Sequence, residues 1–361
     1  MSTRQIPSVD SDTLLLPDAV RHAQERRNAS MQPQSAFAAS KWFNALSRVR
    51  MGTGNAKLLC VGDSTTAGFG ATRASSWPSL VQQRLNLDIA AVPGLAIGMG
   101  LDVDSARWSY GDWTFNFGPG GSGLYANAGS GADAVFTPGI TVDTIDVWWF
   151  QGAGKGSFVV TIDGAPQTPI DTTGGSGIYQ KTTYTVPVGN SHTIALQLPT
   201  GNPVNILGVD AYLSSKNSVR VANWGVSGSI TDTWVNAFYS LNAISSYAPD
   251  LTIVMLGIND SANGVSVDTW SSNMTAIINE AKKSGDVIVM SVFPSNATMV
   301  DSQRLYRDRA QVLAAELDAG FIDLMDKIGA YSEDTYADAL HPNARGYADI
   351  ARYVIAGLRA L

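Results

Sequence analysis

Five short apolar runs, spaced along the chain from residue 57 onward, constrain its fold more than any other feature. They read KLLCVG, SVRVAN, LTIVMLG, DVIVMSV and GFIDL. Segments of helical length separate the last four runs, at residues 231–247, 267–284 and 302–319. Strands that are apolar along their whole length and alternate with helices are typical of a parallel sheet covered on both faces. The sequence therefore predicts an α/β domain, with a further helix at 77–87 after the first strand.

The stretch between Leu95 and Ser214 differs from the rest of the chain in its composition and in the pattern of its apolar residues. It is rich in Gly, Ser and Thr, and it holds alternating runs such as GSFVVTIDG and YQKTTYTVPVG. Short strands separated by turn signals at intervals of about 8 to 12 residues indicate a β-sandwich or jelly roll. We therefore expect an all-β insert at 99–214, within an α/β domain made of 56–98 and 215–361.

Residues 1–55 are expected to form a helical arm. Segments 17–27 and 35–50 have helix-compatible spacing, and the turn-prone NASMQPQS separates them. Two roles stay open for this arm: packing on the main domain, or contact with a partner or another subunit.

Composition narrows the class of partner. The formal net charge of −7 argues against nucleic acid as the main partner, because binding to phosphates needs a basic face. No stretch reaches the ~18 apolar residues of a membrane span, and no signal-peptide core is visible near the start. We expect a soluble protein that is cytoplasmic, virion-associated or exported after processing. The single cysteine, Cys60, excludes an intramolecular disulfide and is expected in the core.

Polar residues follow the predicted strands. GDSTTAG follows the first strand, NWGVSGS the second and GINDS the third, and DALHPNARGY stands near the C-terminus. Ligands of open α/β sheets bind beyond the carboxyl ends of the strands. These four blocks are therefore expected to meet at one edge of the sheet.

Ser64, in the first block, is a candidate nucleophile. A serine hydroxyl needs a neighbouring base, which itself needs an orienting acceptor. We interpret His22 and His192 as surface residues, which leaves His341 as the base with Asp338 three residues earlier on the same face. The alternatives are a polar strand end for Ser64 and a helix-start cap for the Asp-x-x-His-Pro pattern.

Acyl transfer also needs hydrogen-bond donors for the oxyanion, and removal of one costs on the order of 3 kcal/mol. The candidates are the backbone N–H groups of Ser64 and Gly228 and the side-chain amide of Asn259. Taken singly, Gly228 could equally be a turn glycine and Asn259 a loop cap.

Together these blocks resemble the GDSL, or SGNH, hydrolase superfamily. The resemblance spans roughly 57–95 and 218–361, and it rests on GDSTTAG, on Gly228, on GIND and on DALHP. It implies a three-layer, flavodoxin-like α/β/α fold with a five-stranded parallel sheet, a Ser-His-Asp mechanism and no metal. We predict no cofactor, and we expect Asp63 to be a structural hydrogen-bonding residue. The Gly-x-Ser-x-Gly elbow of the α/β-hydrolases is absent at Ser64.

Enzymes of this superfamily act on lipids, thioesters, acetylated sugars and peptidoglycan acetates, so the fold does not fix the substrate. Aromatic side chains of the predicted insert suit stacking on sugar rings, and the substrate-binding candidates are Trp108, Trp113, Trp148 and Trp149. Because Trp148 and Trp149 alternate across a strand, at least one of them is expected in the core. The leading hypothesis is a serine esterase that removes acetyl or short acyl groups from a polysaccharide, with an acylated carbohydrate or another small ester as substrate. The alternatives are a GDSL-type lipase or thioesterase, and a non-catalytic carbohydrate-binding or virion tail protein.

Overall fold

The computed structural model describes residues 39–89, 107–117, 123–127, 129, 131–175, 177–197, 201–215, 217–235, 241–295, 300–328 and 331–360. The helix expected at 17–27, His22 and the predicted domain boundary at 99 lie outside these residues. Within the described part of the chain, no helix has the length and apolar character needed to span a bilayer.

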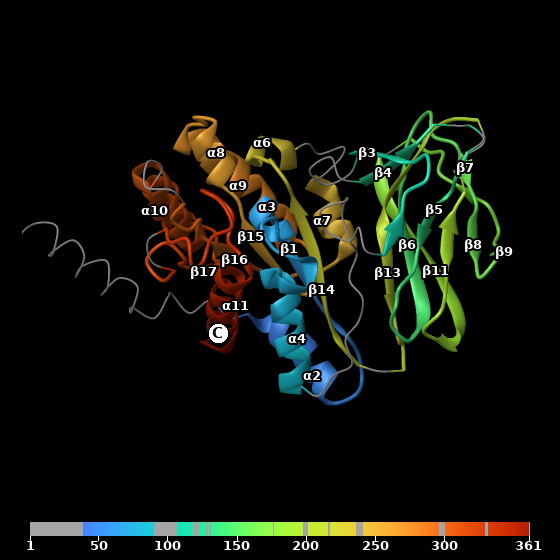
Figure 1. The fold of residues 1–361 in the computed structure, drawn as a ribbon, viewed down its shortest axis with the longest axis horizontal. Coiled ribbons are helices and arrows are strands. Elements are labelled where there is room, and N and C mark those ends of the chain that lie inside the picture. The colour runs from blue at the N-terminus through green and yellow to red at the C-terminus, as the bar shows by residue number, and fades with distance from the viewer. Residues whose placement is uncertain are drawn as a thin grey trace, which may run out of the picture. The chain divides into compact units, whose positions relative to one another are not determined.

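A five-stranded parallel sheet forms the centre of the α/β part (Figure 1). Its strand order is β14-β1-β15-β16-β17, and every neighbouring pair is parallel. The strands are β1 (Ala56–Asp63), β14 (Val219–Val226), β15 (Leu251–Met255), β16 (Asp286–Met290) and β17 (Gly320–Ile322). Each contains residues of one predicted apolar run, so the predicted α/β fold with a five-stranded parallel sheet is confirmed.

Helices cover both faces of this sheet. Alternate residues of β1 point to opposite faces, and Leu58 and Cys60 pack with α2 (Ser40–Arg50), α4 (Trp77–Ile89) and α11 (Ala344–Ala360). Leu59 and Val61 pack on the other face, where the cluster includes residues of α6 (Thr231–Trp234), α7 (Asn242–Tyr247), α9 (Val267–Lys282) and α10 (Val300–Glu316). Cys60 is completely buried, as predicted.

The helix α2 belongs to this core although it lies in the segment expected as an arm. Trp42 and Ala45 are fully buried against the sheet. The backbone N–H of Trp42 donates to Asp286 Oδ2 at 2.8 Å. Residues 40–50 therefore pack on the α/β part, which is one of the two roles left open for the arm.

The described residues between 108 and 212 include two antiparallel sheets with five strands each, in the orders β11-β6-β13-β4-β3 and β2-β5-β12-β8-β9. A shared apolar cluster lies between them. Residues 37–361 form one compact unit, so the domain boundaries at 99 and 214 stay predictions. The strands are β2 (Trp108–Ser109), β3 (Thr114–Phe117), β4 (Gly123–Ala126), β5 (Ala134–Phe136), β6 (Val142–Gln151), β8 (Val160–Ile162), β9 (Ala165–Pro166), β11 (Ile178–Gly189), β12 (Ile194–Leu196) and β13 (Val204–Tyr212), with β7 (Ser157–Phe158) and β10 (Ile170–Asp171) as a separate pair.

The sheet that contains β6 and β13 packs on the α/β part beside its edge strand β14 (Figure 1). Trp148 contacts Tyr247 of α7, with 5.4 Å between ring centroids. Arg220 of β14 forms a buried ion pair with Asp210 of β13 at 2.7 Å. These contacts join the β-rich segment to the edge of the parallel sheet.

Candidate active site

Ser64 begins the short helix α3 (Ser64–Ala67) directly after β1. The carboxylate of Asp63 caps this helix, because its Oδ1 accepts from Thr65 N at 2.9 Å and from Thr65 Oγ1 at 2.7 Å. Glycine is needed at position 62, where a Cβ would lie 2.0 Å from Thr66 Oγ1. Because residue 62 has no side chain, α3 can lie close to the end of β1. Ser64 is then at the carboxyl edge of the sheet.

His341 and Asp338 meet Ser64 at this edge. His341 Nε2 lies 2.9 Å from Ser64 Oγ, and His341 Nδ1 lies 2.8 Å from Asp338 Oδ2. An ionised carboxylate can only accept, so the hydrogen is assigned to Nδ1. Nε2 is then free to accept the hydrogen of the Ser64 hydroxyl. The structure thus brings together the three residues that the sequence analysis selected as a Ser-His-Asp set.

Backbone hydrogen bonds hold Asp338 in its orienting position. Its Oδ1 accepts from the N–H groups of His341 at 2.7 Å and Leu340 at 2.8 Å. Burial acts to raise the pKa of Asp338, but these hydrogen bonds and the His341 side chain outweigh it and hold the pKa below its usual value. The carboxylate therefore stays ionised at neutral pH and can stabilise an imidazolium.

The alternative interpretation of Asp338 as a helix-start cap is wrong. The helix that follows, α11, is capped by Asn343, whose Oδ1 accepts from Arg345 N at 2.9 Å and from Gly346 N at 3.2 Å. His341 lies before this cap, in a turn where Ala337 N donates to its carbonyl oxygen at 2.8 Å.

The predicted oxyanion donors lie at the same edge of the sheet. In the register of the sheet, Asp63 is opposite Val226 and Gly62 is opposite Met255, so the loops after β14 and β15 flank the end of β1. Gly228 in the first loop has a positive φ of 76°, which glycine adopts most readily. Asn259 is the second residue of the helix α8 (Ile258–Ala262) in the second loop, and its Nδ2 donates to Ser229 O at 3.0 Å. This bond ties the two donor loops together.

Sequence reasoning missed a second tie, made by Asp260. This carboxylate is completely buried and accepts from Thr231 N at 3.0 Å and from the Thr231 hydroxyl. Burial raises the pKa of Asp63 to about 6, and the nearby charge of Asp260 acts in the same direction. The one available signal was the aspartate next to Asn259 in GIND, but its partner in the β14 loop could not be read from the sequence.

The four tryptophans predicted to bind substrate are buried side chains. Trp108, Trp113 and Trp149 pack in the cluster between the two antiparallel sheets. Trp148 packs on the opposite side of β6 against the α/β part. At most 9% of any of these residues is exposed, and a buried ring offers no face to a sugar. Burial therefore argues against the role that we predicted for them.

The surface interpretation of His192 is also wrong. It is only 7% exposed, with Nδ1 at 2.6 Å from Asp163 Oδ2 and Nε2 at 2.8 Å from Pro187 O. The hydrogen bond to Asp163 is the main cause that raises the pKa of His192. This histidine ties two turns of the β-rich segment together and lies apart from the Ser64 set in the fold.

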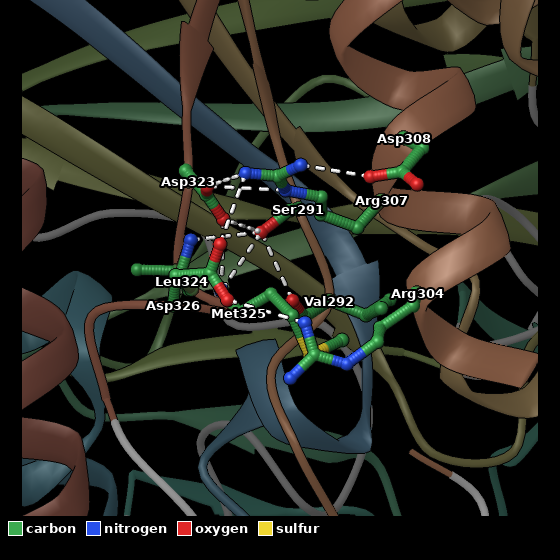
Figure 2. Close-up of polar contacts among 9 residues, drawn as sticks. All are labelled: Ser291, Val292, Arg304, Arg307, Asp308, Asp323, Leu324, Met325 and Asp326. Atoms are coloured by element: carbon green, nitrogen blue, oxygen red, sulfur yellow. Dashed lines mark hydrogen bonds and ion pairs between the residues drawn. The ribbon is translucent and has the colours of Figure 1, made fainter. Parts of the chain in front are cut away.

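Polar residues also follow β16 and β17, but they bind one another (Figure 2). Ser291 Oγ accepts from Leu324 N at 2.8 Å, and Arg307 Nε donates to Asp323 Oδ2 at 3.1 Å. Arg307 and Asp323 are each about 6% exposed at the side chain. This buried network fastens α10 to the ends of two strands. Among the described residues, no group of three or more His, Cys, Asp or Glu side chains is arranged to hold a metal ion.

Comparisons with known proteins show which proteins this chain is similar to. Residues 188–348 match the model of the GDSL-like Lipase/Acylhydrolase family, a range that holds Gly228, Asn259, Asp338 and His341 but not Ser64. An arylesterase of Vibrio mimicus is 30% identical over 103 residues, which are 28% of this chain and 50% of that protein. The chain thus spans half the length of this curated relative.

A solved structure described as "Peptidoglycan O-acetylesterase in action, 5 min" is similar in fold. It has a TM-score of 0.68 and 17% sequence identity, and the match covers 90% of this chain and 97% of that one. The match therefore extends through most of the β-rich segment as well as the parallel sheet. Over residues 188–348 this chain is thus similar to the GDSL-like Lipase/Acylhydrolase family, and in fold it is similar to that solved structure.

Proposed function

We propose that this protein is a serine esterase that removes acetyl or other short acyl groups from a carbohydrate. The observation that carries the proposal is the hydrogen-bonded line from Ser64 Oγ through His341 to Asp338, with 2.9 Å and 2.8 Å at its two steps. A serine within hydrogen-bond reach of an imidazole, itself oriented by a carboxylate, is the arrangement that activates a hydroxyl for attack on a carbonyl.

In the proposed reaction, Ser64 Oγ attacks the ester carbonyl carbon as His341 Nε2 takes the hydroxyl proton. Asp338 stabilises the resulting imidazolium through the Nδ1–H bond. Collapse of the tetrahedral intermediate breaks the bond to the alcohol oxygen, which receives the proton from Nε2. Water then attacks the acyl-enzyme with the same base, and the acid leaves as Ser64 regains its proton.

The oxyanion of each intermediate is assigned to three donors: Ser64 N–H, Gly228 N–H and the Asn259 amide. Asn259 uses its Nδ2 toward Ser229 O, and an amide nitrogen carries two hydrogens. One hydrogen therefore remains for the oxyanion while the other holds the two loops in register. Donors fixed in this way stabilise developing charge without reorganising.

The proposed substrate class is extended from a protein of similar fold. The solved structure with the similar fold is named as a peptidoglycan O-acetylesterase, and we extend an acetylated glycan to this chain as part of the proposal. A lipase or thioesterase would use the same Ser-His-Asp set, so only the acyl and alcohol preferences separate these functions.

The test compares the wild type with Ser64→Ala on p-nitrophenyl acetate and p-nitrophenyl octanoate. Acetate release from O-acetylated peptidoglycan and acetylated xylan is then measured. We expect Ser64-dependent turnover, preference for acetate and release from at least one glycan. Ser75→Ala, a serine outside the proposed site, is the matched control and should keep full activity. Octanoate preference would indicate a lipase, and turnover that does not need Ser64 would overturn the proposal.

A further inference from the structure

Phe69 is a large apolar residue that stays exposed beside the proposed catalytic base. It is 48% exposed. Its ring centroid lies 4.5 Å from that of His341, and the two ring planes are inclined by 54°. An exposed aromatic ring that touches a catalytic imidazole is well placed to contact a substrate.

The backbone on both sides of this ring is fixed. Phe69 N donates to Ser64 O at 3.0 Å, and Phe69 O accepts from the Tyr347 hydroxyl at 2.6 Å. Gly70 has a φ of 89°, and a Cβ there would lie 2.7 Å from Pro342 O and 3.0 Å from His341 Cβ. The loop that carries Phe69 is therefore pressed against the His341 segment and tied to the nucleophile, so the base of the ring has a defined position.

The roles of Ser64 and His341 in the proposed reaction determine which part of the ester lies next to the Phe69 ring. His341 Nε2 delivers its proton to the leaving alcohol oxygen, so the alcohol must lie against the imidazole when the acyl-enzyme forms. The carbonyl oxygen turns instead toward Gly228 and Asn259, which belong to loops on other strands. A side chain packed on the imidazole thus contacts the alcohol portion rather than the acyl chain.

We propose that Phe69 determines specificity for the alcohol, by packing its ring against the pyranose that bears the ester. This inference rests on the proposed function, because it assigns the two ends of the ester from the roles of Ser64 and His341. Phe69 is an exposed aromatic side chain of the α/β part that can contact a sugar ring, whereas the tryptophans of the β-rich segment are buried.

The test separates the alcohol from the acyl group. Two acetates with different alcohols, an acetylated glucopyranoside and ethyl acetate, are compared for the wild type, Phe69→Ala, Phe69→Leu and Phe69→Trp. Ethyl butyrate tests the acyl side. We expect Phe69→Ala and Phe69→Leu to lower kcat/KM on the acetylated pyranose about tenfold, mainly through KM, since an aromatic contact is worth about that factor. Phe69→Trp should keep most of the activity, and ethyl acetate should change less than about twofold.

Two results would overturn the inference. Equal losses on both acetates, in kcat and with an altered pH profile, would mean that Phe69 only positions His341. A changed ratio of acetate to butyrate, with alcohol preference intact, would place the ring on the acyl side. Thermal melting of each variant shows whether it is folded. If the wild type itself shows no Ser64-dependent turnover, the proposed function fails, and that outcome is distinct from either of these.

Discussion

Functional residues were predicted by residue type at two places, just after the parallel strands and within the antiparallel strands. The two sets of predictions had opposite outcomes. Ser64 and Asn259 follow strands that are neighbours in the sheet, and the fold brings them to one edge. Trp148 and Trp149 lie within β6 and face two different apolar clusters. A residue just after a parallel strand lies at the carboxyl edge of the sheet, where Ser64 and Asn259 meet, although Ser291 and Asp323 after β16 and β17 are buried. A residue within a strand is accessible only if its face is uncovered, and both faces of β6 are covered.

The largest effect expected from this comparison is at His341. His341→Ala should lower kcat by about 10⁴-fold, because the base and the general acid are lost together. His192→Ala is the matched control, since it removes the other histidine of the described residues. It should leave kcat unchanged while lowering the melting temperature. Steady-state kinetics and thermal unfolding of both variants measure this, and equal kcat values would exclude His341 as the base.

Trp149→Ala should act on stability instead of substrate binding. Removal of a buried aromatic side chain from the cluster between the two sheets is expected to lower the free energy of unfolding by about 3–5 kcal/mol. KM should stay within about twofold of the wild type, because the proposed catalytic residues are not in this cluster. Urea unfolding and KM for an acetylated glycan test this. A raised KM with unchanged stability would restore the sugar-binding role.

Asn259→Ala probes a strand-end residue with a more limited role. Loss of one oxyanion donor is expected to lower kcat by about 10²-fold to 10³-fold, with KM little changed, because the interaction is made in the transition state. Kinetics under saturating substrate measure this. Full activity in this variant, together with an inactive Ser64→Ala, would show that the oxyanion is held by other groups.

The smallest predicted effect concerns Asp63, a buried carboxylate at the end of β1. Its pKa in the fold is raised to about 6, chiefly by burial, above the ordinary value of about 3.9 in an unfolded chain. Above pH 6 the folded protein therefore bears the cost of a buried charge. This cost disappears as pH falls from 6 to 4, because the folded state takes up the proton first.

Asp63→Asn removes that charge while keeping an oxygen that can accept from Thr65. The variant should be more stable than the wild type at pH 7, by about 2–3 kcal/mol, and the difference should vanish by pH 4. Urea unfolding at the two pH values measures it. Lower stability of the variant at pH 7 would mean that the ionised cap outweighs the burial of its charge.

The sequence predicted the five strands because they depend on local patterns, and it selected Ser64, His341 and Asp338 by residue type, although Ser64 and His341 are 277 residues apart. Apolar runs such as LTIVMLG mark buried strands, and serine, histidine and aspartate are the residue types that acyl transfer needs. The ties made by Asp260 with Thr231, and by His192 with Asp163, are 29 residues apart in each case. Pairs this far apart cannot be identified from a local sequence pattern. The alternation of side chains along a strand also does not show which other elements cover each of its faces.

The long interruption between β1 and its partners has a consequence for how the protein is made. Ser218, next to β14, bonds to Asn55 across 163 residues of chain. At about 5–20 residues per second of translation, β1 leaves the ribosome about 10–30 s before β14 is complete. Pairing of strands so distant in sequence is slow, and an unpaired apolar strand invites aggregation. Until its neighbouring strands exist, the elements close to β1 in sequence that can cover it are α2 and α4, which share its apolar cluster in the fold.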